Sequence, residues 1–490
     1  MKTKNPPLIT LKDARTTGYR VEDVTPGILH FGIGNFHRAH QSLYLDRLME
    51  LNGDLQWGII GAGIMEGDKT LRDTLLAQDC CTTIVEESAN QSQPHVVSSM
   101  RDFLPVGDVE AIIDTIADPR IKIISLTVTE GGYFLDEITG TFNDRHPDIV
   151  SDAKAVKAPK TVFGLILAGL SRRREAGHGA LTIMSCDNLP HNGVVAKNAV
   201  LGLARLQDQE ICAWVEDNIA FPSGMVDRIT PATGDKERAR IRDEFGIDDK
   251  APVFCESFAQ WVLEDNFPAG RPALEQVGVE FTADVAPFEM MKLRILNGGH
   301  AAIAYPSALM GYEYVSEAMA DPLISGFLNA LHKREIIPSV PPVPNTDLAE
   351  YAETVVERFS NPRIVDRIDR LCYDGKNRQP KFILPTIRDR LSDGANIDGL
   401  ALLSALWCRY CQGKTDEGAE ILSNDPVWPD LSAAAHAAQS DPMAWLGQSE
   451  IYAELGENPD FVTAFKDGLR TVTALGTREA LARYINNQRP

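Results

Sequence analysis

The chain has 490 residues, of which 44% are hydrophobic and 24% charged, with a formal net charge of −21. This composition describes a globular protein long enough for two or three domains and excludes a mainly disordered chain. The negative charge argues against nucleic acid and anionic membrane surfaces as main partners, because a phosphate-binding face would have to overcome that field. The N-terminus leads into no long apolar run, and no segment approaches the roughly 20 apolar residues that span a bilayer. We therefore expect a soluble, cytoplasmic protein.

The eight cysteines are dispersed along the chain, which is not the density of a disulfide-stabilised secreted protein. Cys408 and Cys411 form a lone C-x-x-C pair inside a helical pattern. A structural zinc site needs four ligands, and no second pair or histidine pair accompanies them. We therefore interpret them as buried helical thiols and expect no metal.

The first half of the chain alternates short apolar segments with helical patterns, which is typical of βαβ units on a parallel sheet. Strands are predicted at residues 27–33, 57–61, 122–127 and 180–185, and helices at 38–50, 161–176 and 192–206. The predicted fold class is therefore α/β, with a doubly wound N-terminal domain.

From about residue 284 the pattern changes to amphipathic helices. They are predicted at residues 322–333, 346–360, 400–412 and 461–475, and the proline-rich segment 338–344 interrupts them. We place the first domain at residues 1–283 and a mainly α-helical C-terminal domain at residues 284–490.

Two glycine-rich strand ends suggest a nucleotide site. The first strand runs into Gly32 and Gly34, a Gly-x-Gly turn that could offer backbone amides to a phosphate, although His37 stands where a third glycine is usual. The second strand ends in Gly61-Ala62-Gly63 and is followed by Asp68, whose carboxylate could accept from the ribose of NAD and repel the 2′-phosphate of NADP. A tight turn and a helix-terminal acid are the structural alternatives.

The segment KLRILNGGH at residues 292–300 sets a lysine, an asparagine and a histidine beside apolar neighbours. A helix turns about 100° per residue, so Lys292, His300 and Asn297 would fall at roughly 0°, 80° and 140° and could share one face. A lysine in apolar surroundings has a lowered pKa and can accept a proton, while an amide N–H can stabilise an alkoxide. The trio suits alcohol oxidation without a metal. The alternative is a solvated lysine, a helix end at Asn297 and a buried histidine.

Four segments together resemble the polyol-specific long-chain dehydrogenases, the mannitol 2-dehydrogenase family. They are GIGNFHRAH at 32–40, TEGGY at 129–133, SCDNLPHNG at 185–193 and KLRILNGGH at 292–300. The likeness covers nearly the whole chain in order. It implies an N-terminal Rossmann-type domain, a helical substrate-binding and catalytic domain, and a cleft between them for NAD and an open-chain polyol.

The resemblance also implies roles for individual residues, position by position. Lys292 would be the general base, Asn188 and Asn297 would hold the alkoxide oxygen, and Glu130 would provide a proton path. The substrate would contact His300, Asp227 and Arg370, and also Arg378, which stands where the family often has lysine. The implied cofactor-binding residues are Gly32, Gly34, Phe36, His37, Arg38 and Asp68.

The implied activity is the metal-independent interconversion of a polyol and its ketose with NAD, of the mannitol/fructose or arabinitol/xylulose type. A hexuronate reductase of the same family, such as fructuronate reductase, is the alternative, because Arg370 could pair with a carboxylate as well as bond hydroxyls. Tyr410 and Lys414 match the Tyr-x-x-x-Lys pattern of short-chain dehydrogenases but lie in the helical half, far from any glycine-rich strand end. A non-catalytic NAD or sugar sensor would not need Lys292. The preferred polyol and the oligomeric state, possibly monomeric, stay open.

Overall fold

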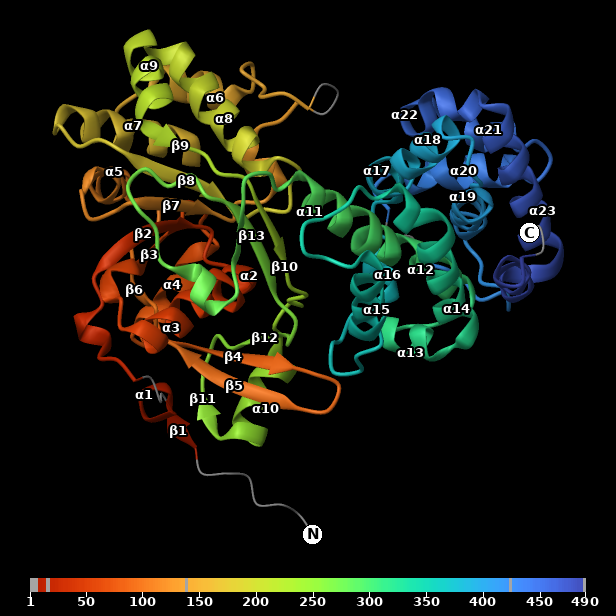
Figure 1. Ribbon diagram of the computed structural model, residues 1–490, viewed down its shortest axis with the longest axis horizontal. Coiled ribbons are helices and arrows are strands. Elements are labelled where there is room, and N and C mark those ends of the chain that lie inside the picture. The colour runs from red at the N-terminus through yellow and green to blue at the C-terminus, as the bar shows by residue number, and fades with distance from the viewer. Residues whose placement is uncertain (1–7, 15–17, 137–139, 423–424, 488–490) are drawn as a thin grey trace. The chain divides into compact units, whose positions relative to one another are not determined.

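A computed structural model describes residues 8–14, 18–136, 140–422 and 425–487 of the protein. The chain divides into two compact units, Met1–Ala286 and Pro287–Pro490. Figure 1 shows that the first unit is built on β-sheets and that the second is built from helices.

A six-stranded sheet forms the centre of the first unit. Its strands lie in the order β6 (Met100–Phe103), β3 (Gly58–Ala62), β2 (Pro26–Phe31), β7 (Ile123–Leu126), β8 (Leu181–Ser185) and β9 (Ile219–Ala220). Every neighbouring pair is parallel. Counted along the chain these strands have the order 3-2-1-4-5-6, which is the doubly wound Rossmann arrangement. The predicted fold class is thus confirmed.

The strands of this sheet are buried on both faces because helices cover both. Leu29 and Phe31 of β2 belong to one apolar core with α5 (Val109–Ala117), α7 (Val162–Glu175) and α8 (Asn192–Gln207). Ile28, which points the other way, belongs to a second core with α3 (Gln41–Asn52). This alternation follows from the two-residue period of a strand. The remaining helices of the first unit are α1 (Leu11–Ala14), α2 (Asn35–Ala39), α4 (Asp68–Leu76), α6 (Pro147–Lys154), α9 (Gln209–Asn218) and α10 (Asp235–Phe245).

Three smaller sheets surround the main one and have no counterpart in the sequence prediction. One has the order β10 (Gly224–Asp227), β13 (Gln260–Glu264), β14 (Glu280–Thr282). Another has the order β12 (Val253–Glu256), β4 (Thr82–Glu87), β5 (Ser92–Val97), and the third pairs β1 (Ile9–Thr10) with β11 (Ile247–Asp248). They matter for function because β10 ends at Asp227, one of the predicted substrate contacts.

The regular elements in the described part of the second unit are all helices, as predicted. The α-helices are α11 (Ala286–Met291), α12 (Gly298–Leu309), α13 (Val315–Ala320), α14 (Pro322–Leu331), α15 (Leu348–Phe359), α16 (Ile368–Cys372), α17 (Gly375–Phe382), α18 (Leu384–Ser392), α19 (Asp398–Tyr410), α20 (Trp428–Ala437), α21 (Met443–Leu446), α22 (Ser449–Tyr452) and α23 (Pro459–Ile485). Two π-helices, Lys292–Asn297 and His332–Ile336, lie among them. None of the helices in the described ranges is long and apolar enough to cross a bilayer.

Candidate functional site

The first half of the candidate site lies where the order of the main sheet reverses, between β2 and β7. In open sheets of this topology, ligands bind outside the carboxyl ends of the strands at that point. The segments that follow the strand ends there carry the predicted residues: Gly32 and Gly34 after β2, Glu130 after β7, Asn188 after β8 and Asp68 after β3. The topology therefore gathers, at one edge of the sheet, residues that are up to 156 positions apart in the chain.

Gly32 and Gly34 form a turn whose first position requires glycine. Gly32 has φ +94°, and a Cβ there would lie 2.0 Å from the carbonyl oxygen of Thr127. The N–H of Gly34 donates to the carbonyl of Gly32 over 2.7 Å. A Cβ at Gly34 would meet nothing nearer than 3.9 Å, so the backbone here is open to a ligand. Bare backbone of this kind suits the close approach of a pyrophosphate.

A buried polar network supports this turn from behind. The ring of His30 contacts the hydroxyls of Ser125 (2.7 Å) and Thr127 (2.9 Å), and the Thr127 hydroxyl donates to the carbonyl of Gly32 over 2.6 Å. The ring of His37 stacks on His30 with 3.5 Å between centroids. Burial lowers the pKa of His30 to about 3, so both its ring nitrogens serve this network as a neutral imidazole.

The predicted cofactor residues Phe36, His37 and Arg38 lie on α2, directly after the turn. His37 and Arg38 are buried, and the guanidinium of Arg38 donates to the side chain of Asn35 over 2.7 Å and to the backbone of Gly34 over 3.3 Å. Burial, together with the charges of neighbouring basic groups, holds the pKa of His37 well below its usual value. The geometry thus gives His37 and Arg38 a part in shaping the turn, and their contact with a cofactor stays a prediction.

Asp68 is the first residue of α4 and lies beyond the end of β3, the strand next to β2. Its carboxylate accepts the N–H of Met65 over 3.0 Å, and a Cβ at Gly63 would lie 2.7 Å from that carboxylate. Asp68 therefore fits both interpretations of the sequence: it is an acid at a helix start, and it follows the end of the second strand. Its position suits the ribose end of a dinucleotide in this topology.

Glu130 and Asn188 are exposed and lie on the loops that follow β7 and β8. Asp187, the residue before Asn188, is buried. Its carboxylate accepts hydrogen bonds from the backbone N–H groups of Val128 (3.0 Å) and Thr129 (2.9 Å). Burial raises the pKa of Asp187, while hydrogen bonds to its carboxylate oppose that rise. Sequence reasoning quoted Asp187 within a motif but gave it no role.

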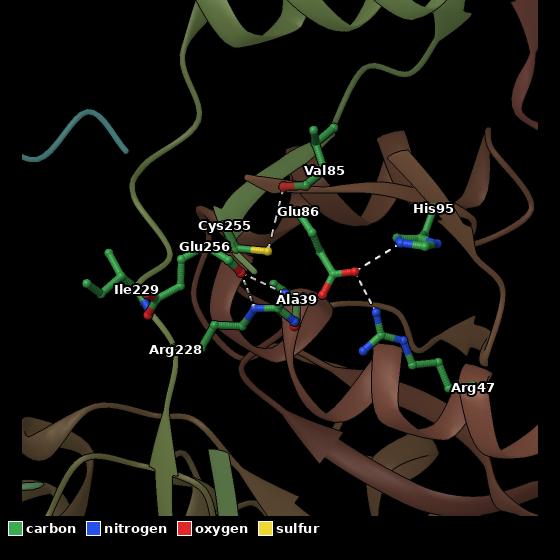
Figure 2. Close-up of polar contacts among 9 residues, drawn as sticks. All are labelled: Ala39, Arg47, Val85, Glu86, His95, Arg228, Ile229, Cys255 and Glu256. Atoms are coloured by element: carbon green, nitrogen blue, oxygen red, sulfur yellow. Dashed lines mark hydrogen bonds and ion pairs between the residues drawn. The ribbon is translucent and has the colours of Figure 1, made fainter. Parts of the chain in front are cut away.

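Asp227 is buried at the end of β10, and the next residue, Arg228, fixes that strand end. Figure 2 shows Arg228 beside Glu86, with Arg47 and His95 on the other side of the carboxylate. Arg228 also donates to the carbonyl of Ala39, the last residue of α2, over 2.7 Å. Burial would raise the pKa of Glu86, but the contact with His95 and the charges of Arg228 and Arg47 lower it to about 2.

The second half of the candidate site begins at Lys292, which is buried with 8% of its surface exposed. Residues Lys292–Asn297 form a π-helix between α11 and α12. The angular positions predicted for Lys292, Asn297 and His300 assumed a regular α-helix, and that assumption is wrong for this stretch. Single π-turns inside α-helices are rare and are frequently found at functional sites. The ring Nε2 of His332 contacts the carbonyl of Ile295 at 3.0 Å, so this carbonyl of the π-helix has a side-chain partner.

His300 lies on α12 in the same unit and is buried. Its ring stacks on Phe359 with 3.9 Å between centroids, and its Nε2 has no hydrogen-bond partner among the described residues. Burial first, and then the charges of Arg370, Arg378 and Arg358, hold its pKa well below the usual value. His300 is therefore a neutral imidazole with one nitrogen left for a hydroxyl group.

Asp366 connects His300 with Arg370. Its carboxylate accepts two hydrogen bonds from the guanidinium of Arg370, at 2.8 and 2.7 Å, and lies 3.8 Å from Nε2 of His300. Asp366 is buried, whereas the side chain of Arg370 is 60% exposed. Arg378 on α17 lies close enough to lower the pKa of His300, and its Nε is buried without a partner in the described part of the chain.

The predicted residues divide between the two units. The first unit holds Gly32, Gly34, Phe36, His37, Arg38, Asp68, Glu130, Asn188 and Asp227, and the second holds Lys292, Asn297, His300, Arg370 and Arg378. Sequence reasoning missed Asp187, Asp366 and Glu86. Asp187 and Glu86 contact segments 58 and 142 positions away, and Asp366 contacts Arg370 four positions away. All eight cysteines are buried free thiols, and within the described ranges no group of three or more His, Cys, Asp or Glu could hold a metal ion.

Comparisons with known proteins agree with this arrangement. Residues 26–276 match the model of the mannitol dehydrogenase Rossmann domain, and residues 284–473 match that of the mannitol dehydrogenase C-terminal domain. The chain is 52% identical over 468 residues to a mannitol 2-dehydrogenase of Cereibacter sphaeroides, covering 95% of this chain and 98% of that protein. It is 40% identical to a mannitol dehydrogenase of Saccharomyces cerevisiae, with 97% of each chain covered.

Two solved structures extend the likeness to three dimensions. One is the Pseudomonas fluorescens mannitol 2-dehydrogenase in a ternary complex with NAD and D-mannitol, with a TM-score of 0.85, 40% identity, and 98% of this chain and 97% of that one covered. The other is a D-sorbitol dehydrogenase in substrate-free form, with a TM-score of 0.88, 33% identity, and coverage of 95% and 97%. The sheet order, the two matched domains and these relatives together show that the chain belongs to the mannitol dehydrogenase family.

Proposed function

We propose that this protein is an NAD-dependent polyol dehydrogenase that interconverts D-mannitol and D-fructose. The observation that supports this most is Lys292, buried in a π-helix with Asn297 and His300 within the next eight residues. A base, an amide donor and a neutral imidazole are the groups needed to take a proton from an alcohol and to bind its oxygen, and here they lie close together in the sequence. D-Arabinitol with D-xylulose is the nearest alternative pair, since it also has a secondary alcohol next to a terminal CH₂OH.

The residues at the sheet edge fit NAD. The open backbone at Gly32 and Gly34 suits the pyrophosphate, and the carboxylate of Asp68 can accept from the adenosine ribose. A carboxylate there repels a 2′-phosphate, so NAD is the expected coenzyme rather than NADP. When bound, NAD accepts the hydride that leaves the carbinol carbon.

The side chains of this protein then manage the proton and the oxygen. Loss of hydride leaves positive character on the carbon, which is relieved as the hydroxyl gives its proton to the neutral amine of Lys292. The side-chain N–H groups of Asn188 and Asn297 donate to the oxygen while it carries negative charge. Glu130 is the proposed path for this proton to solvent. In ketose reduction each of these transfers runs in the opposite direction.

The remaining polar groups form hydrogen bonds with the other hydroxyls of the substrate. His300 offers its free Nε2, and Asp227, Arg370 and Arg378 offer charged hydrogen-bonding groups. The bidentate pairing of Arg370 with Asp366 balances the charge of that guanidinium within the protein itself. This favours an uncharged polyol over a hexuronate, whose carboxylate would compete with Asp366 for the same fork.

A substrate panel tests the proposal. Initial rates of NADH formation are measured with D-mannitol, D-arabinitol and D-sorbitol, and rates of NADH oxidation with D-fructose, D-xylulose, fructuronate and tagaturonate, each also with the NADP pair. The proposal predicts the highest kcat/KM for D-mannitol and D-fructose with NAD and NADH. High turnover of fructuronate or tagaturonate with negligible polyol activity would contradict it and favour the hexuronate reductase.

A further inference from the structure

The loop after β7 contains a strained residue directly before Glu130. Thr129 has φ +62° and ψ 167°, a region of backbone conformation that is essentially restricted to glycine. A threonine persists there only if the surrounding structure holds it, and such residues cluster at functional sites. A neighbouring group must therefore hold Thr129 in this conformation.

The carboxylate of Asp187 is that group. It accepts the N–H of Val128 over 3.0 Å and that of Thr129 over 2.9 Å, so two successive amides of the strained turn point at one side chain. The hydroxyl of Tyr133, which is fully buried just after the turn, donates to the same carboxylate over 2.6 Å. Asp187 is only 8% exposed, and the three donors on its carboxylate fix the path of the chain on both sides of Glu130.

Asp187 is also the residue that precedes Asn188 on the loop after β8. Its own carbonyl accepts the N–H of Leu189 over 2.9 Å and the side-chain amide of Asn192 over 3.1 Å. Asn192 in turn exchanges two hydrogen bonds with the backbone of Gly224, at 2.8 and 2.9 Å, where β10 begins. One residue therefore connects the loop that carries Glu130 with the loop that carries Asn188.

We propose that Asp187 is a positioning residue that sets Glu130 and Asn188 in register at the edge of the sheet, so that the proton path and the alkoxide donor act on the same substrate oxygen. The proposal rests on the proposed function, because it assigns Asp187 the task of placing two groups that touch the reacting atoms or pass their proton. Asp187 itself contacts backbone and Tyr133, and acts through the residues it holds.

A second buried aspartate of the same unit provides a matched control. The carboxylate of Asp152 accepts the N–H groups of Lys160 (2.9 Å) and Thr161 (2.9 Å) and the hydroxyl of Thr161 (2.7 Å). It thus has the same set of donors as Asp187, two amides and one hydroxyl. Its hydrogen bonds serve the start of α7 and none of the loops that carry predicted site residues. Loss of stability alone should affect Asp187→Asn and Asp152→Asn alike.

The test compares Asp187→Asn with Asp152→Asn, using the polyol that the wild-type protein oxidises fastest with NAD. An asparagine at 187 turns an N–H₂ group towards a backbone donor, so the turn must shift. We expect kcat to fall by about 10²-fold, the lower end of an acid–base contribution, with NADH affinity unchanged. We also expect a solvent deuterium isotope effect on kcat to appear or grow, because proton transfer becomes limiting. Asp152→Asn should keep kcat within about twofold, as expected for a change outside the site.

A double variant shows whether Asp187 acts through Glu130. If it does, the loss of kcat in Glu130→Gln/Asp187→Asn is smaller than the product of the two single losses. Tyr133→Phe removes one donor and keeps the carboxylate, and it should lower kcat by roughly tenfold, as one lost hydrogen bond to the carboxylate implies. This variant decides the matter if Asp187→Asn does not fold.

Three outcomes would overturn the inference. The first is a normal kcat in Asp187→Asn or, if that variant does not fold, a normal kcat in Tyr133→Phe. The second is a loss of kcat in Asp152→Asn equal to that in Asp187→Asn. The third is a double variant whose loss of kcat equals the product of the two single losses. A wild-type protein inactive on every polyol would instead contradict the proposed function, and this inference with it.

Discussion

Buried carboxylates fix several of the residues in both halves of the candidate site. Asp187 holds the turn before Glu130, Asp366 holds Arg370, and Glu86 holds Arg228 next to Asp227. Arg228 was not predicted, whereas Glu130, Asp227 and Arg370, which these carboxylates hold or adjoin, were predicted from the family resemblance. Asp187 and Glu86 were not, because each contacts a segment 58 or 142 positions away, and no spacing rule links such positions.

Asp68 tests the coenzyme assignment at the scale of one residue. Asp68→Ala should narrow the preference for NAD over NADP, because it removes both an acceptor for the ribose hydroxyls and a negative charge that repels the 2′-phosphate. The measurement is the ratio of kcat/KM for the two coenzymes at saturating polyol. Asp73 on the same helix provides the control, since its side chain is 75% exposed and pairs with Arg72. An unchanged ratio in Asp68→Ala, equal to that in Asp73→Ala, would show that the assignment is wrong.

At the scale of the elements, the sequence predicted four of the six strands of the main sheet to within about two residues and the long helices nearly as well, and it missed β6 and β9. Strong periodicity explains this success, because strands buried on both faces and amphipathic helices have clear patterns. The three small sheets were missed, since their strands pair segments as far apart as 238 residues, as in Ile9 with Ile247. The π-helix at Lys292 was also missed, because no periodicity marks it in the sequence and its contact with His332 comes from a segment 37 positions away.

The π-helix gives a prediction about pH. Burial lowers the pKa of His332 to about 4, whereas an unfolded histidine titrates near 6.5. Between these values the unfolded chain binds a proton that the folded chain does not, so stability present above pH 6.5 is lost as the pH falls towards 4. Relative to His332→Gln, the wild-type protein should lose about 1.4 kcal/mol of unfolding free energy per pH unit in this window.

Denaturant unfolding of the wild-type protein and of His332→Gln, at pH values from 7 to 4, measures this difference in unfolding free energy. His436→Gln provides the control because His436 is exposed on α20. Parallel curves for the wild-type protein and His332→Gln would mean that His332 does not stay neutral in the folded unit.

At the scale of the whole molecule, we propose that the two units divide the chemistry. The Rossmann unit offers the residues that fit NAD, and the helical unit offers the base and most of the substrate contacts. Composition and the change of pattern near residue 284 were enough to predict two domains of these classes. The identity of the polyol depends on a few hydrogen bonds to hydroxyl groups, which differ little between sugar alcohols of similar length. Spacing in the sequence therefore could not specify it.

The central claim is that Lys292 takes the proton from the alcohol. The most direct test is kcat/KM for D-mannitol oxidation as a function of pH in the wild-type protein, Lys292→Ala and Lys333→Ala. Lys333 is a suitable control because it is exposed and lies in the other π-helix. We expect wild-type oxidation to rise with pH, since only the neutral amine accepts a proton. Lys292→Ala should lose that rise and about 10²-fold or more in rate, with NADH binding intact, while Lys333→Ala keeps both. Near-normal turnover and an unchanged pH profile in Lys292→Ala would contradict the mechanism.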